Sequence, residues 1–205
     1  MPRTVDHDQR RSVILKAFVA VAAREGLHAV SLRAVAAEAD VSLRLVQYYF
    51  DTKAGLMQAG LAHLEYLSNE RLRARLLSSG RSPTARATLE ALFAVALPTD
   101  VESRQFHLLW TSYAMLAITA PEISGRAFID SPNRLQERIV SILEQGKAAG
   151  EFAQEIDPKA EAYILLALIH GLGTAVLVGQ QSADIASSSY AYHLDRFASE
   201  SPSNE

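Results

Sequence analysis

The sequence predicts an all-α protein of about nine helices. Apolar residues recur at three- and four-residue spacing in nearly every segment, and no stretch alternates for long enough to indicate a β-strand. Glycine, proline and serine residues separate these segments, as expected between helices. With 205 residues, 49% of them hydrophobic, the chain can bury a core of its own. It has no cysteine, which excludes disulfides and thiolate chemistry and favours the cytoplasm.

Four helices are predicted in the N-terminal part of the chain. The first spans about residues 8–25 and ends at Gly26, a residue that favours a helix stop. Ser31 and Ser42 are candidate N-caps of two short helices, because their hydroxyls can accept a hydrogen bond from a backbone N–H of the first turn. Residues 52–77 follow as a long fourth helix.

Five further helices are predicted after a break at residues 78–83. They cover residues 84–97, 101–119, 122–149, 158–178 and 183–198. Residues 163–179 are strongly apolar, but 17 residues fall short of the roughly 20 that span a bilayer. A buried interface helix is therefore the preferred interpretation, and no membrane association is expected.

Charge divides the chain into two predicted domains and a tail. Residues 1–55 carry a net charge of +2, whereas the rest carries −5. A basic N-terminal segment joined to an acidic remainder is consistent with a small nucleic-acid-binding domain at the N-terminus. We expect a helix-turn-helix DNA-binding domain at 1–55, a ligand-binding and dimerisation domain at 56–199, and a disordered tail at 200–205.

The helix after Ser42 has two predicted faces. Val41, Val46 and Phe50 are expected to point inward, which leaves an outward strip able to read base edges. The strip consists of Leu43, Arg44, Gln47 and Tyr48. Around it, four residues at or near helix N-termini are candidates for phosphate contact, namely Ser31, Tyr49, Thr52 and Lys53. The alternative is a solvated surface on an ordinary pair of helices.

The N-terminal part resembles the TetR family of bacterial transcriptional regulators. The matching segments, in order over nearly fifty residues, are "VILKAF", "REGLHAVSLRAVAAEADVS", "YYF" and "TKAGL". The resemblance implies that Leu43, Arg44 and Gln47 read bases. Arg44, Gln47 and Tyr49 replace a glycine, a tyrosine and a histidine that are common in the family, and two of these lie on the reading strip. The resemblance implies a dimer that binds a palindromic operator. Because Arg44 and Gln47 depart from the family pattern on the reading strip, the operator sequence is expected to differ from those of other family members.

The body more weakly resembles the betaine-responsive subgroup of the same family, which implies a small-molecule inducer of unknown identity. Aromatic residues at helical spacing could line a mostly apolar pocket, although such a stripe is more often core. The candidates are Phe93, Phe106, Trp110, Tyr113, Phe128 and His170. His107 is expected to be a solvated neighbour. The apolar helix near the C-terminus is expected to form a homodimer with the last helix. The interface candidates are Leu168, Gly171, Leu172, Ala175, Tyr190, Leu194 and Phe197.

Two other classes of protein fit the sequence less well. An enzyme is disfavoured because the sequence lacks a nucleophile elbow, a phosphate loop and a zinc-protease motif, and its six histidines show no metal-ligand spacing. No cofactor and no metal are predicted. A helical ligand-binding or protein-interaction module without sequence-specific DNA binding remains the alternative. Repressor and activator are both open, with the family favouring a repressor.

Overall fold

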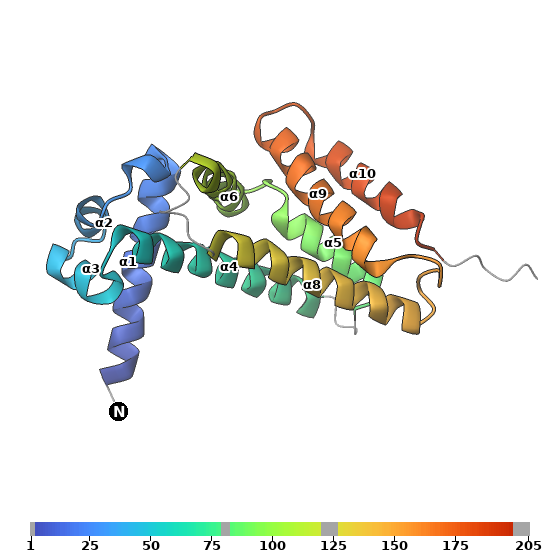
Figure 1. Cartoon of the computed structure of the whole chain (residues 1–205), viewed down its shortest axis with the longest axis horizontal. Coiled ribbons are helices and arrows are strands. Elements are labelled where there is room, and N and C mark those ends of the chain that lie inside the picture. The colour runs from blue at the N-terminus through green and yellow to red at the C-terminus, as the bar shows by residue number, and fades with distance from the viewer. Residues whose placement is uncertain (1–2, 79–82, 120–126, 199–205) are drawn as a thin grey trace, which may run out of the picture. The chain divides into compact units, whose positions relative to one another are not determined.

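The computed structural model describes residues 3–78, 83–119 and 127–198, and within these ranges the chain forms nine α-helices (Figure 1). The helices are α1 (Arg3–Glu25), α2 (Leu32–Glu38), α3 (Leu43–Phe50), α4 (Lys53–Leu77), α5 (Ala85–Ala96), α6 (Val101–Thr119), α8 (Ala127–Ala148), α9 (Pro158–Leu177) and α10 (Ala183–Asp195). A single turn of 3-10 helix, η1 (Leu27–Ala29), lies between α1 and α2. The predicted all-α class is confirmed.

Two helix boundaries differ from prediction by several residues, and the predicted start of the helix at 122–149 lies outside the described residues, within which α8 begins at Ala127. Helix α1 begins at Arg3 rather than near residue 8, so it is more than one turn longer than the apolar stripe alone indicated. Helix α10 ends at Asp195, and the chain leaves it through a turn to Ala198, which pairs with Phe152 in an isolated β-bridge. The predicted tail at 200–205 lies outside the described residues.

The chain divides into two compact units. Unit 1 comprises Met1–Leu67 and Leu108–Ile129, and unit 2 comprises Ser68–His107 and Asp130–Glu205. Helices α4 and α6 are therefore each divided between the two units. In unit 1, α1 packs on α2, and α2 packs on α3. Its core contains Ile14, Phe18 and Val21 of α1, which recur at helical spacing and are all buried.

Unit 2 is built around α5, α9 and α10, with one face of α8 adding to the core. Phe93 of α5 stacks on Tyr190 of α10, with ring centroids 4.1 Å apart and planes 12° from parallel. Leu194 and Phe197 are buried in the same core. Tyr190, Leu194 and Phe197 were predicted at a dimer interface, and that prediction is wrong, because each is at most 1% exposed within the single chain.

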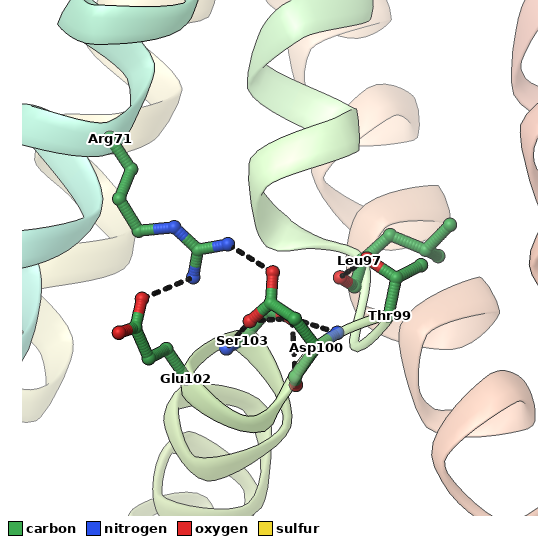
Figure 2. A network of polar contacts seen from close by, with 6 residues as sticks. All are labelled: Arg71, Leu97, Thr99, Asp100, Glu102 and Ser103. Atoms are coloured by element: carbon green, nitrogen blue, oxygen red, sulfur yellow. Dashed lines mark hydrogen bonds and ion pairs between the residues drawn. The ribbon is translucent and has the colours of Figure 1, made fainter.

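A polar network in unit 2 joins α4 to the beginning of α6 (Figure 2). Asp100 and Ser103 cap α6 reciprocally: the Asp100 carboxylate accepts from the Ser103 backbone N–H at 2.8 Å, and Ser103 Oγ accepts from the Asp100 N–H at 3.1 Å. Arg71 of α4 donates to the same carboxylate, and the carboxylate of Glu102 lies 4.0 Å from the Arg71 guanidinium. The hydrogen bonds from Ser103, followed by the Arg71 charge, hold the pKa of Asp100 below its usual range.

Candidate nucleic-acid interface

Helices α2 and α3 are joined by a tight turn whose geometry is set by local residues. Ser31 Oγ accepts from the Ala34 N–H at 3.1 Å, and Ser42 Oγ accepts from the Leu45 N–H at 3.2 Å, so both predicted N-caps are confirmed. Between the two helices, Asp40 adopts a φ of 52°, in the left-handed region that reverses the chain after α2. Two short helices separated by such a turn form a helix-turn-helix.

Helix α3 has the two faces that the sequence predicted. Val46 is fully buried and Phe50 nearly so, which fixes the helix on the core of unit 1. On the opposite side Arg44 and Gln47 are exposed, and the Tyr48 side chain is 72% exposed. Leu43 is partly buried at the start of the helix. An exposed guanidinium, carboxamide and phenol on one helical strip supply the donors and acceptors that major-groove recognition requires.

The four residues predicted to contact phosphates differ in burial and in whether their polar groups already have hydrogen-bond partners. The Ser31 and Thr52 hydroxyl oxygens accept backbone N–H groups, of Ala34 and of Gly55 respectively, but each hydroxyl keeps its own proton to donate. Lys53 points its ammonium at the carbonyl of His28, 3.5 Å away. Tyr49 is partly buried against its neighbours. Lys53 would thus have to share or exchange its partner on meeting a phosphate.

An ion pair connects α1 to α2. Arg24 donates to the carboxylate of Glu38 at 2.8 Å and to that of its neighbour Glu25 at 3.0 Å. The hydrogen bond from Arg24 lowers the pKa of Glu38. Both side chains are largely in solvent, so the pair orients the helices more than it stabilises them.

The residues predicted to line a ligand pocket come from both units. Phe93, Phe106 and His170 belong to unit 2, whereas Trp110 and Tyr113 belong to unit 1. Tyr113 is 1% exposed and donates its hydroxyl to the Met57 carbonyl at 2.5 Å, so its polar group already has a partner. Phe93 is used in the core stack with Tyr190. Phe106 and Trp110 are partly buried, and the side chain of Phe128 lies outside the described part of the structure. The pocket remains a prediction.

His107 is buried, contrary to the sequence-based expectation. It is 3% exposed, and its Nε2 lies 3.1 Å from Oγ1 of Thr174 on α9. The ring occupies space left by Gly173, where an added Cβ would lie 2.8 Å from Nδ1 and nearer still to Cε1. Burial lowers the pKa of His107. Its partners on α9 lie 66 and 67 residues away, so the local sequence pattern gave no signal of its burial.

The pKa of His170 is also lowered, to about 4, chiefly by burial and then by the neighbouring His107. Both imidazoles are therefore neutral near pH 7, and neither adds positive charge to the interior of unit 2.

Among the interface candidates on α9, Gly171 is exposed, and an added Cβ there would meet nothing within 4 Å. Leu168, Leu172 and Ala175 are partly buried. Helix α9 is long and apolar enough to cross a membrane by length and composition alone, yet it packs on α5 and α10. The large apolar residues still exposed on α9, at its C-cap and on α10 are Tyr163, Ile164, Val178, Ile185 and Tyr192.

Two family models match the chain. Residues 14–59 match the model of bacterial regulatory proteins of the tetR family, which covers the helix-turn-helix. Residues 85–199 match the C-terminal domain of the BetI-type transcriptional repressors.

Relatives agree with these matches. The chain is 28% identical over 181 residues to the HTH-type transcriptional regulator BetI of Serratia proteamaculans, covering 84% of this chain and 83% of that protein. It is 31% identical over 131 residues to the HTH-type transcriptional repressor KstR of Rhodococcus jostii, covering 64% of this chain and 58% of that protein.

Solved structures show the same fold over nearly the whole chain. A TetR-family transcriptional regulator from Rhodococcus sp. superposes with a TM-score of 0.82 at 26% identity, covering 94% of this chain and 100% of the other. A transcriptional regulator from Saccharomonospora viridis, in complex with choline, gives a TM-score of 0.79 at 25% identity, covering 94% and 99%. The helix-turn-helix geometry, the two family models and these likenesses agree: the chain belongs to the TetR family of bacterial transcriptional regulators, with a BetI-type C-terminal domain.

Proposed function

We propose that the protein is a repressor that binds a palindromic operator as a homodimer and leaves it when a small molecule binds the body. The observation that carries this proposal is the strip on α3, where Arg44, Gln47 and Tyr48 are exposed while Val46 and Phe50 hold the helix in place. A helix fixed on one face and polar on the other can enter the major groove without first rearranging.

The α3 strip is proposed to read the bases, and the residues around it are proposed to position the helix by contacting phosphates. Arg44 can bond a guanine bidentately, Gln47 can bond an adenine, and Leu43 can meet a thymine methyl group. Ser31, Thr52, Tyr49 and Lys53 are proposed to hold the phosphates on either side. The proteins of this family act on DNA in the cytoplasm, where we propose that this chain also works.

The homodimer is proposed to form through the exposed apolar surface of α9 and α10. Ile185 and Tyr192 lie seven residues apart on α10, with Ser188 and Ser189 between them, so these residues share one stripe. On α9, Ile164 and Gly171 repeat at the same spacing, which continues to Val178 at the C-cap. Large exposed apolar surface is costly in water, and a two-fold related copy would cover it. Two heads would then meet successive major grooves on a palindrome.

Choline is the first inducer to test, because a structural relative was solved in complex with it. The small molecule is proposed to act through α4 and α6, since both helices contribute to both units. Arg71 and Asp100 connect these two helices within unit 2 (Figure 2), so a ligand that shifts α6 would also act on α4. A ligand changes operator affinity only as far as it prefers one head arrangement over the other.

The proposal is tested by incubating the purified protein with a library of randomised duplexes and sequencing the bound fraction. Enrichment of a palindrome, with affinity that falls steeply as salt rises, is the expected result. Binding with no sequence preference, or no binding at low salt, would favour the alternative of a helical ligand-binding module. A mobility-shift titration on the selected duplex with choline then tests induction, and unchanged affinity would exclude choline as the inducer. Reporter expression with and without the protein separates a repressor from an activator.

A further inference from the structure

A chain of aromatic rings connects the beginning of α1 to the recognition helix α3. The His7 imidazole lies 4.7 Å from the Tyr49 ring and 5.9 Å from the Tyr48 ring, measured between centroids, with planes 63° and 70° apart. Tyr48 and Tyr49 are themselves 5.3 Å apart at 82°. Edge-to-face contacts at these distances are the favourable arrangement for aromatic side chains.

A second residue of α1 reaches the same helix. The guanidinium carbon of Arg11 lies 5.8 Å from the centroid of the Phe50 ring, within the range of a cation–π contact. His7 and Arg11 are four residues apart, so they lie on one face of α1. That face therefore meets α3 at two points: the pair of the exposed Tyr48 and the partly buried Tyr49, and the buried Phe50 at the end of the helix.

The position of His7 matters because Tyr48, apart from its contact with the neighbouring Tyr49 ring, is 72% exposed. An exposed side chain samples several rotamers within nanoseconds. A ring packed against it narrows that range before DNA arrives, which lowers the entropy cost of binding. The family model that matches the head begins at residue 14, so this support comes from residues that precede the matched region.

We propose that His7 is a positioning residue for operator recognition: its ring orients Tyr48 and Tyr49 and so sharpens the base preference of α3. This inference rests on the proposed DNA-binding function and adds a determinant of specificity outside the helix-turn-helix. His7 acts through the two tyrosines, so removing its ring should matter only while a tyrosine is present to be oriented.

The test uses the full chain with His7→Ala, His7→Phe and Gln9→Ala. Phe keeps a ring that can pack edge to face but has no ring nitrogen, and Gln9, an exposed residue of the same helix, controls for changes to α1 itself. Each protein selects duplexes from a randomised library, and its affinity for the wild-type selected duplex is measured by fluorescence anisotropy. Thermal unfolding of each variant is recorded alongside.

We expect His7→Ala to bind the selected duplex about two- to tenfold more weakly per head, the range that one aromatic pair supplies. It should also broaden the base preference at one or two positions of each half-site. His7→Phe should restore both, and Gln9→Ala should match the wild type. The His7→Ala effect should shrink in a Tyr48→Ala background, where only Tyr49 is left to be oriented, as coupled residues do in a double-mutant cycle.

Three results would overturn the inference. His7→Ala could match Gln9→Ala in affinity and base preference, His7→Phe could be as weak as His7→Ala, or the Tyr48→Ala background could leave the His7→Ala effect unchanged. In each case the wild type would still enrich a palindrome, so the proposed function would stand. If the wild type enriched no sequence, the proposed function and this inference would fail together.

Discussion

Replacing Gly173 of α9 by alanine should destabilise the protein even though alanine is the better helix former. An added Cβ would lie 2.8 Å from Nδ1 of the buried His107 and nearer still to Cε1, where carbon atoms normally approach to about 3.5–4.0 Å. The ring cannot easily retreat, because its Nε2 lies 3.1 Å from Oγ1 of Thr174 and it also hydrogen-bonds the backbone of Ala96.

The opposing effects can be compared in magnitude. Alanine in place of glycine within a helix contributes about 1 kcal/mol of stability. Overpacking a core costs about 1–3 kcal/mol, and a displaced ring that leaves a buried polar group unpaired costs about 1–3 kcal/mol more. The steric cost therefore exceeds the gain in helix propensity, and Gly173→Ala should lower the free energy of unfolding by about 1–5 kcal/mol. For a chain of this length that corresponds to a fall in Tm of about 2–20 °C.

Gly171→Ala is the matched control, because it makes the same change two residues away in the same helix and its Cβ would meet nothing within 4 Å. It should raise stability by about 0.5–1 kcal/mol. The free energy of unfolding is measured by urea titration with circular dichroism at 222 nm. Because Gly171 lies on the proposed dimer surface, the titration is repeated at two protein concentrations, which separates a change in association from a change in folding.

The double variant His107→Ala, Gly173→Ala tests the cause. Without the imidazole the new methyl group has room, so adding Gly173→Ala to His107→Ala should cost nothing or stabilise slightly. If Gly173→Ala proved as stable as Gly171→Ala, or if its cost persisted without His107, the proposed fit between the ring and the glycine would be refuted.

Three further predictions concern DNA recognition, pH and assembly. Arg44→Ala should relax base preference by about 1–3 kcal/mol at one position per half-site, whereas Lys53→Ala should weaken all duplexes alike; library selection and salt titration distinguish the two, and the reverse assignment would contradict the division between reading and positioning. Because burial lowers the pKa of His170 to about 4 from 6.5, the unfolded chain binds a proton that the folded chain does not between these values, so stability should fall by about 2–3 kcal/mol as pH drops from 6.5 to 4. His170→Gln should flatten that part of a pH series of urea titrations, and an unchanged slope would show that His170 is not the cause. Tyr192→Glu, on the exposed stripe of α10, should sediment as a monomer at micromolar concentration, while Tyr66→Glu, at an exposed tyrosine of α4, should not; equal behaviour of the two variants would exclude this surface.

The sequence by itself determined the helices and the division of α3 into two faces. Caps at Ser31 and Ser42 and apolar spacing are local properties, since a hydroxyl reaches only three residues along the chain and helical periodicity repeats within two turns. Val46 and Phe50 could therefore be placed inside, and Arg44 and Gln47 outside, before any tertiary contact was known. The same local rules missed the first residues of α1, which carry no apolar stripe.

Tertiary structure decided which of several apolar surfaces is buried. Helix α10 carries two stripes, one through Tyr190 and Leu194 and one through Ile185 and Tyr192, and periodicity alone cannot rank them. Packing of α10 on α5 and α9 buries the first and leaves the second exposed, because only the first meets Phe93. The burial of His107 and the position of His7 could not be predicted for the same reason. His107 packs against α9 residues 66 and 67 positions away, and His7 against α3 residues more than 40 positions away, and no local pattern encodes contacts at that separation.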